Sequence, residues 1–153
     1  MSYVSRVLQP GETVVYATTL HWLIYLRAIV LLIVAIGLAI ASQWATGNGN
    51  LALLIAAALF GLLAISSGVR AWLRRVTTEL AVTDLRVIYK AGLLGRHTLE
   101  MNRSKVESVD VDQSLLGRIF GYGTIIVRGT GGSLEPMRNI RNPIDFRSHI
   151  TAR

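Results

Sequence analysis

The sequence predicts a two-helix transmembrane hairpin joined to a small, mainly β domain. Two uncharged apolar stretches, residues 28–45 and 51–69, lie close together in the first half of the chain. After residue 75 the pattern changes to short segments rich in β-branched residues and separated by turn residues. The composition agrees, because only 16% of the residues are charged, against about 25% in an average soluble domain. Part of the apolar surface is therefore expected to face lipid.

Each apolar stretch has the length of a membrane-spanning helix. A rise of about 1.5 Å per residue brings each close to crossing a hydrocarbon core of about 30 Å. The sequence between them, Thr-Gly-Asn-Gly-Asn at 46–50, is too short for anything but a turn, so the helices run antiparallel. We expect residues 1–22 to form an N-terminal cytoplasmic or juxtamembrane segment, residues 23–69 the hairpin, and residues 76–153 a cytoplasmic domain.

Charged and aromatic residues predict the orientation of the hairpin. Arginines lie at the ends away from the turn, which itself has no charge; they are Arg27, Arg70, Arg74 and Arg75. The excess of basic residues on cytoplasmic loops then places both termini in the cytoplasm, at the inner cell membrane. Tryptophan and tyrosine near both ends of the stretches are typical of interfacial belts; they are Trp22, Tyr25, Trp44 and Trp72.

Small residues recur on one face of each predicted helix. They are Ala35 and Ala39 in the first helix, and Ala57, Gly61, Ala64 and Gly68 in the second. Such residues let two helix backbones approach closely, so we interpret them as the packing seam of the hairpin. Alanine-rich stretches also contain such spacings by chance.

A secretory signal is the competing interpretation of the first stretch. Ala39-Ile40-Ala41 resembles a small-x-small cleavage site after an apolar run. The preceding region is long and patterned and includes Glu12, which favours a membrane helix instead.

The second half of the chain predicts a curled antiparallel sheet or open barrel. Its strand candidates are residues 77–83, 85–90, 96–101, 105–111, 124–128 and 133–138. Alternation of Val109 and Val111 with Asp110 and Asp112 indicates one buried and one wet face. The glycine-rich run 129–132 lies between two strands and predicts a hairpin turn with positive φ, because a phosphate-binding loop would precede a helix.

Two further segments flank this pattern. Asn142 as a cap, Pro143 at the first helical position and an apolar pair at Phe146 and Ile150 predict a short C-terminal helix. The N-terminal stretch 14–20 is either a further strand or a juxtamembrane connector, and the sequence leaves both open.

Several motifs in this order resemble one known family. They are the segment 79–88 (ELAVTDLRVI), Gly92-Leu93-Leu94-Gly95-Arg96, Lys105-Val106-Glu107-Ser108-Val109, residues 113–124 (QSLLGRIFGYGT), and the N-terminal Leu8-Gln9-Pro10-Gly11-Glu12 with His21. The chain resembles the bacterial pleckstrin-homology (PH)-like membrane proteins over nearly its whole length. The resemblance implies a seven-stranded, partly open PH-like barrel with a C-terminal helix, a fold used for recognition more often than for catalysis. Phosphoinositide binding is not implied, because the dense basic cluster that it requires is missing.

No catalytic, cofactor or metal site is expected. The histidines, His21, His97 and His149, lie far apart without partners at metal-ligand spacing, cysteine is absent, and the serines lack a nucleophile elbow. Asp110 and Asp112 could hold a cation but are more simply solvated. The predicted domain after residue 76 has eleven basic and eight acidic residues. That scattered, mildly basic balance argues against nucleic acid, and no small-molecule substrate is indicated.

Two groups of residues are candidate contact sites. The first is an apolar stretch between two strands, for which packing in the core is the simplest interpretation and contact with the membrane or with a partner is the alternative; its residues are Leu115, Leu116, Arg118, Ile119, Phe120 and Tyr122. The second could meet lipid headgroups; its residues are Arg27, Arg70, Arg74, Arg75, Lys90 and Arg96. The simpler interpretation of the juxtamembrane arginines is a topology signal.

The expected function is therefore binding. We expect a membrane-anchored PH-like module that presents its β domain at the inner membrane surface to a membrane-protein partner or to copies of itself. The alternative from another class is a sensor of anionic lipid that works through the basic residues.

Overall fold

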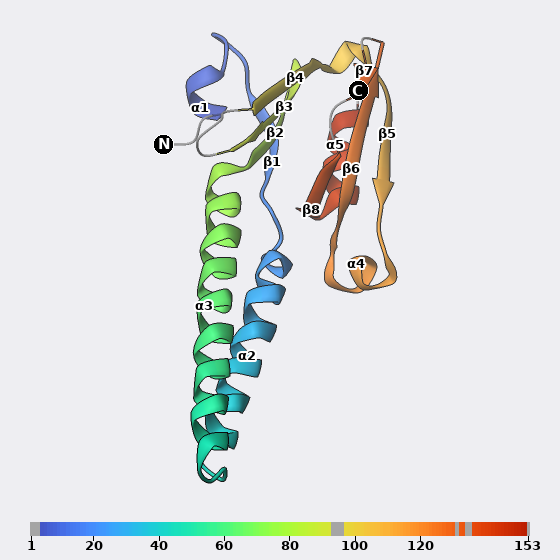
Figure 1. The fold of residues 1–153 in the computed structure, drawn as a ribbon. Coiled ribbons are helices and arrows are strands. Elements are labelled where there is room, and N and C mark those ends of the chain that lie inside the picture. Colours follow the sequence, from blue (N-terminus) through green and yellow to red (C-terminus); the bar gives the residue numbers. More distant parts are fainter. Residues whose placement is uncertain (1–3, 93–96, 131, 134–135, 153) are drawn as a thin grey trace. The chain divides into compact units, whose positions relative to one another are not determined.

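The computed structural model describes residues 4–92, 97–130, 132–133 and 136–152. The chain forms two compact units, a helical one at Trp22–Leu73 and a β-rich one that combines Met1–His21 with Arg74–Arg153 (Figure 1). The β-rich unit is thus assembled from chain segments on both sides of the helical unit.

The helical unit begins with the 3₁₀ turn η1 (Trp22–Tyr25), which runs into α2 (Leu26–Ala41), and α3 (Asn48–Thr77) follows. Both helices are long and apolar enough to cross a membrane, and only 6% of the most apolar window in each is buried. Such nearly complete exposure is unlike the core helix of a soluble protein, which buries most of its apolar side chains.

The helix ends differ from the predicted bounds of 28–45 and 51–69. Helix α2 ends at Ala41, and the side-chain hydroxyl of Ser42, the next residue, donates to the carbonyl of Ala39. Helix α3 begins inside the predicted turn and continues past the arginines to Thr77. The predicted bounds follow hydropathy, which identifies only the part of a helix that can lie in lipid. Helix α3 is longer because charged residues can continue the backbone hydrogen bonds of a helix, here as far as Thr77.

The residues of the predicted seam include the least exposed positions of the two helices. Ala35 and Ala64 are buried, and a Cβ at Gly68 would lie 3.7 Å from the Cβ of Ala28. A Cβ at Gly61 would meet no atom within 4 Å among the described residues. Ala39 and Ala57 are half-buried. The close approach is therefore concentrated around Gly68.

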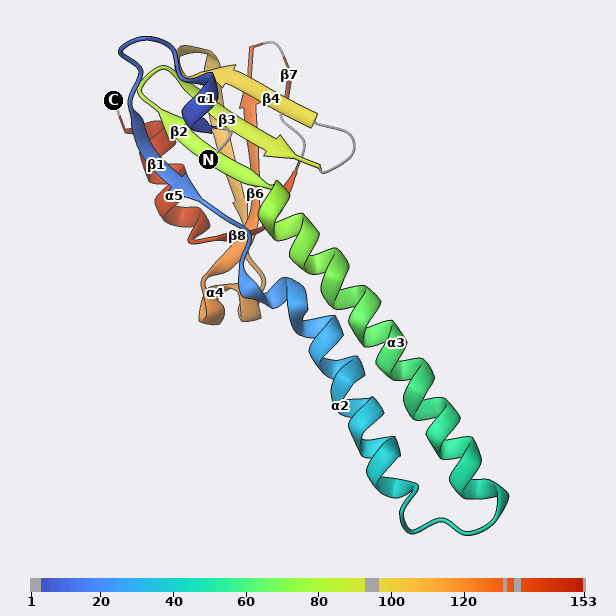
Figure 2. The same ribbon diagram turned by 90° about the vertical axis from the view of Figure 1, so that its left-hand side faces the viewer.

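Sheet A of the β-rich unit is antiparallel, in the order β1–β2–β3–β4 (Figure 2). Its strands are β1 (Val14–Thr18), β2 (Glu79–Thr83), β3 (Arg86–Ala91) and β4 (His97–Asn102). The N-terminal stretch is thus a strand, which settles the question that its sequence left open. Thr18 pairs with Leu80, so strands from either side of the helical unit are direct neighbours.

Sheet B follows the 3₁₀ turn η2 (Arg103–Lys105). Its strands are β5 (Val106–Asp112), β6 (Tyr122–Gly129), β7 (Gly132–Ser133) and β8 (Met137–Arg141), with the short helix α4 (Leu115–Phe120) between β5 and β6. The predicted strand 133–138 is wrong in its bounds, because its first residue belongs to β7 and its last two residues belong to β8. The predicted positive φ occurs at Gly132, with a value of 129°.

The C-terminal helix α5 (Pro143–Thr151) begins where the sequence predicts, with Pro143 after the cap Asn142. Phe146 and Ile150 are buried, as their spacing predicts. Phe146 meets the ring of Tyr16 edge-on, at a centroid distance of 6.2 Å. The largest fully buried side chains of the β-rich unit are apolar; they are Phe146, Leu80, Ile88, Ile125, Met137 and Ile140. These two sheets and the C-terminal helix make the β-rich unit mainly β, as the sequence predicts.

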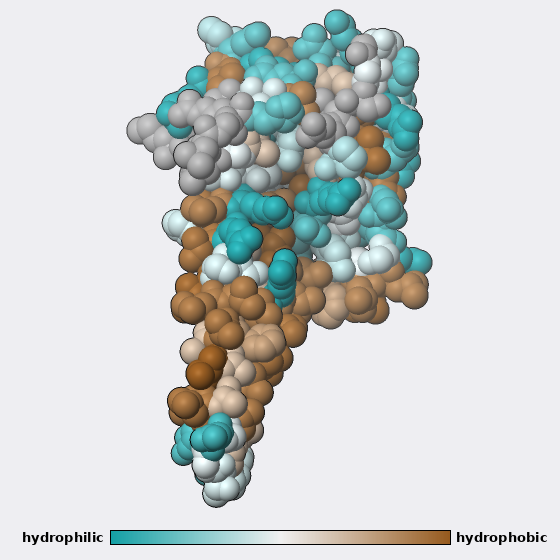
Figure 3. Space-filling model, in the orientation of Figure 1, coloured by the Kyte–Doolittle hydropathy of each residue, from teal (hydrophilic) through white to brown (hydrophobic). Residues whose placement is uncertain are grey.

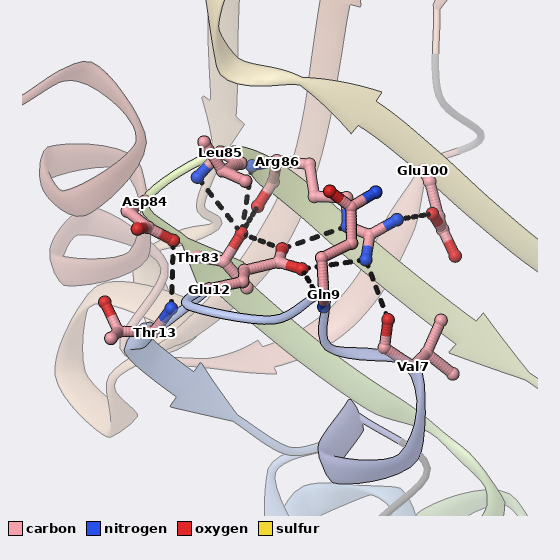
Figure 4. A network of polar contacts seen from close by, with 9 residues as sticks. All are labelled: Val7, Gln9, Glu12, Thr13, Thr83, Asp84, Leu85, Arg86 and Glu100. Atoms are coloured by element: carbon pink, nitrogen blue, oxygen red, sulfur yellow. Dashed lines mark hydrogen bonds and ion pairs between the residues drawn. The ribbon is translucent and has the colours of Figure 1, made fainter.

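A network of polar contacts ties the N-terminal segment, including α1 (Val4–Val7), to sheet A (Figure 4). Arg86 donates to both carboxylate oxygens of Glu12, at 3.0 and 2.8 Å, and to the carbonyl of Val7. The Thr83 hydroxyl donates to Glu12 at 2.6 Å, and the other guanidinium nitrogen pairs with Glu100 at 2.6 Å.

The side chain of Glu12 has no exposed surface, so its charge requires these partners. Hydrogen bonds from Arg86 lower the pKa of Glu12 to about 2, against the opposing effect of desolvation, with further help from the backbone of Gln9 and from Thr83. Glu12 therefore stays ionised in the folded protein at every physiological pH.

Candidate functional site

The candidate site is the surface of α4, which holds most of the apolar residues that the sequence singled out between β5 and β6. Two caps fix this short helix. At its start the Ser114 hydroxyl accepts a hydrogen bond from the backbone of Gly117 at 3.1 Å. At its end Gly121 adopts a left-handed conformation with a φ of 72°, which glycine allows without a steric penalty.

Gln113 adds a third constraint. Its side-chain amide donates to the carbonyl of Tyr122 at 3.0 Å and reaches that of Gly117 at 3.4 Å. Gly117 lies within α4 and Tyr122 follows it, whereas Gln113 precedes it. The side chain of Gln113 therefore links the residue before the helix to the helix itself and to the strand after it. The helix is therefore held by polar bonds within its own segment.

The inward face of α4 is made by glycine. Gly117 is buried, and a Cβ at this position would lie 2.6 Å from the carbonyl oxygen of Tyr122. A Cβ at Gly123, on the strand that follows, would lie 2.7 Å from Gln113 and 2.8 Å from the carbonyl of Asp112. The helix thus packs on the sheet through its backbone, which leaves its larger side chains on the outside.

Those larger side chains are apolar and exposed. Leu115 is 78% exposed and Ile119 is 74% exposed, and Leu116 and Phe120 also lie at the surface. Figure 3 shows the resulting apolar surface at the α4 end of the β-rich unit. The core-packing alternative therefore fails for these residues, because glycine occupies the position that faces the sheet. A contact with a partner, as the sequence suggested, stays a prediction.

Helix α4 lies beside the point at which the chain leaves the β-rich unit. The ring of His21, the last residue of the N-terminal segment in this unit, stacks on Tyr122 at a centroid distance of 5.5 Å. Its backbone N–H donates to the carbonyl of Asn139 at 2.8 Å, and its ring hydrogen-bonds to the backbone of Phe120. The last residue of α4 and the chain exit are therefore in direct contact.

The surroundings of His21 favour its neutral form. Burial lowers the pKa of the imidazole first, and the positive charges of Arg141 and Arg75 lower it further, while the bond to Phe120 acts in the opposite direction. At neutral pH the ring therefore serves as an uncharged stacking and hydrogen-bonding group.

Two of the predicted headgroup residues, Lys90 and Arg70, each contact a residue outside that set. Lys90 pairs with Glu79 at 3.9 Å and is largely covered. Arg70 is exposed and donates to the carbonyl of Ser66 at 3.3 Å. Arg27, Arg74 and Arg75 are exposed, and Arg96 lies outside the described residues. The juxtamembrane arginines are thus the accessible members of the set.

The other residues that the sequence considered have structural partners. His149 stacks on Tyr16 at 4.4 Å, and Asp110 pairs with Arg128 at 2.8 Å on the surface. Within the described residues no group of three or more histidines and acids is arranged to hold a metal ion.

An open hollow of about 490 Å³ lies between η2 and the end of α5. Its central charge, Arg103, donates to the carbonyls of His149, Ile150 and Ala152. The guanidinium therefore neutralises the C-terminal end of α5. Sequence analysis missed this role, because only the folded chain brings η2 to α5.

Of the comparisons with known proteins, the one with protein families identifies the family of the chain. No curated protein and no solved structure matches the chain. A family model described as "Bacterial PH domain" matches residues 13–153, a range that begins just before β1 and includes the helical unit. The family predicted from the motifs is confirmed, and the chain belongs to the bacterial PH domain family.

Proposed function

We propose that this protein is a membrane-anchored PH-like binding module. The observation that carries the proposal is the exposure of α2 and α3, whose most apolar windows are only 6% buried. In water such a surface would be far larger than the apolar patches of soluble monomers. In lipid the same side chains are solvated, and the helices satisfy their own backbone groups.

The arginines support one orientation. Arg27 near the start of α2 and Arg70, Arg74 and Arg75 near the end of α3 lie at the ends away from the connecting turn, which carries no charge. A hairpin inserted by the positive-inside bias has both termini in the cytoplasm and its Gly-Asn turn outside.

The β-rich unit then acts at the inner membrane surface. Its fold offers recognition surfaces, and confinement to a membrane raises its effective concentration for partners in the same membrane. Its partner is another membrane protein or a second copy of the chain. We propose no catalytic role.

Sensing of anionic lipid is less well supported. Lys90 is paired with Glu79, so the basic residues that could act in sensing are mainly the juxtamembrane arginines, which the topology already explains. Reconstitution of the whole chain in nanodiscs with and without anionic lipid separates the two roles. A sensor would change its conformation or partner binding with lipid charge and lose that response in high salt.

Single-cysteine labelling tests the anchor directly, since the natural chain has no cysteine. Gly49→Cys in the turn is expected to react with a membrane-impermeant maleimide in intact spheroplasts. Ser108→Cys on β5 is expected to react only after the membrane is opened. Both variants should stay in the membrane pellet after alkaline carbonate extraction. Extraction into the supernatant, or labelling of Ser108→Cys from outside, contradicts the proposal.

Cross-linking in native membranes tests the binding role. A photoreactive group at Ser108, an exposed position on β5, is expected to yield a discrete adduct, either a dimer of the chain or one membrane protein. A chain that stays monomeric and unmodified at this position, while the cysteine test shows insertion, would leave an anchor without the proposed binding role.

A further inference from the structure

We propose that α4 is an interfacial anchor, whose exposed apolar side chains enter the headgroup and upper acyl layer of the bilayer that holds α2 and α3. The inference rests on the proposed membrane anchoring and adds a second, separate lipid contact made by the β-rich unit. The side chains that carry it are Leu115, Leu116, Ile119 and Phe120.

Helix α4 exposes its apolar side chains and buries a glycine. A short helix on a sheet normally buries its apolar side chains and exposes its polar ones. Here the buried position is Gly117, whereas Leu115 and Ile119 are among the most exposed apolar side chains of the β-rich unit. Such an arrangement leaves apolar surface in water unless something apolar covers it.

Helix α4 is also pre-organised by hydrogen bonds at its two ends. Ser114, Gly121 and Gln113 satisfy backbone groups at both ends of α4, at distances of 3.0–3.1 Å for the closer bonds. These bonds already pair several backbone groups at the two ends of the helix, each of which would cost several kcal/mol if it entered lipid without a partner. Little conformational entropy remains to be lost on contact.

The place of α4 in the chain favours lipid over a protein as the occupant of its apolar surface. His21 hydrogen-bonds to the backbone of Phe120 and stacks on Tyr122, and the next residue in the chain begins the apolar helical unit. The strand pairing of Thr18 with Leu80 brings the return connection to the same end of sheet A. The chain therefore enters the apolar helical unit directly after a residue that contacts α4.

The charges around α4 fit the same interface. Arg118 is exposed within the helix and lines a hollow with Ile144, itself an exposed apolar residue at the start of α5. Arg75 and Arg141 are close enough to His21 to lower its pKa. Asp145 lines the same hollow as Arg118, so the charges near α4 are of both signs, and the arginines among them are of the kind that meet the headgroups of an anionic leaflet.

Depth-dependent quenching tests the inference in the full chain. Single cysteines at Ile119, at Ser108 and at Ile33 are labelled with an environment-sensitive fluorophore, and each protein is placed in nanodiscs at one copy per disc. Lipids with a bromine or nitroxide at a known depth act as quenchers. Ile119 should show at least about twofold stronger quenching than Ser108 by shallow quenchers, since interfacial helices lie roughly 5–10 Å into the headgroup boundary. Ile33, which is 63% exposed on α2, should respond to deep quenchers.

The outcomes separate the inference from the proposed function. If Ile33 is not quenched, the anchor itself fails. If Ile33 is quenched but Ile119 behaves like Ser108, the chain is anchored and α4 does not touch lipid. A blue-shifted, unquenched label at Ile119 only in discs with two copies would assign α4 to a protein contact instead and overturn the inference.

A substitution pair supplies the matched control. Leu116→Ser with Ile119→Ser removes two exposed apolar groups and should leave the unfolding transition unchanged, because neither side chain is in the core. In this background a label at Leu115 is expected to lose at least half of its shallow quenching. Unchanged quenching in a folded variant would contradict lipid contact through this surface.

Discussion

At the scale of single residues, Glu12 and Arg86 form the least exposed ion pair among the described residues. Glu12 precedes the helical unit and Arg86 follows it, yet their side chains meet at 2.8 Å with almost no access to water. A buried pair of this kind contributes little net free energy over an apolar pair, but breaking it leaves a charge without a partner.

Replacement of Glu12 by Gln is therefore expected to destabilise the β-rich unit by about 3 kcal/mol, because the Arg86 charge would lose its main partner. Pulse proteolysis in urea, with the whole chain held in detergent, measures the change. Asp110→Asn is the matched control, since Asp110 and Arg128 form an equally short pair whose side chains are about half exposed. That control should cost less than about 1 kcal/mol. Equal effects of the two substitutions would contradict the role of burial.

The same pair predicts the acid dependence of stability. The pKa of Glu12 falls from 4.5 to about 2 on folding, so between these pH values the unfolded chain binds more protons than the folded one. The contribution of Glu12 is therefore complete above about pH 5 and is lost as the pH falls towards 2. The stability difference between the natural chain and Glu12→Gln should shrink over this window. A difference that stays constant from pH 6 to pH 2 would refute the assignment.

At the scale of elements, α4 depends on glycine at its inward face. The carbon of a methyl group at Gly117 would lie 2.6 Å from the carbonyl oxygen of Tyr122. That carbon is bonded directly to the backbone, and the oxygen is itself a backbone atom, so neither atom can move aside without moving the chain.

Gly117→Ala is expected to cost about 1–3 kcal/mol, because the added methyl overpacks the contact between α4 and the sheet. Gly61→Ala is the control, since a Cβ there meets nothing within 4 Å among the described residues and alanine favours a helix. Urea unfolding of both variants in detergent makes the comparison. Loss of stability in Gly61→Ala alone would place the tight contact in the helical hairpin instead.

At the scale of the whole molecule, sheet A is completed across the helical unit. Strand β1 lies before it and pairs with β2, which lies after it, so residues 76–153 alone would leave the edge of β2 unpaired. They would also lack Glu12, the main partner of Arg86.

Residues 76–153 alone are therefore expected not to fold cooperatively. A chain that joins residues 1–21 to residues 76–153 by a short flexible linker should fold, since Thr18 and Leu80 are paired neighbours. Proton–nitrogen NMR spectra of the two proteins make the comparison, with dispersed signals expected only for the joined one. Well-dispersed signals from residues 76–153 alone would show that β1 is dispensable.

The general architecture could be predicted because it depends on local patterns. Long uncharged stretches such as 28–45 can be stable only as helices that face apolar surroundings, and the alternation around Val109 indicates a strand with one buried face. Asn142, Pro143, Phe146 and Ile150 predict α5 for the same reason. The family motifs add the order of these elements and the resemblance that the family match confirms.

The positions of particular side chains could not be predicted in this way. The apolar sequence of α4 is compatible with leucines that face the core and with leucines that face outward. Only the close contact of Gly117 with Tyr122 decides that they face outward. Lys90 reads as a free basic residue until sheet A places it against Glu79. Local hydropathy and spacing thus determine which segments are helices, strands or apolar stretches. Tertiary structure alone decides which groups far apart in the chain meet, because those contacts depend on how the sheets pack.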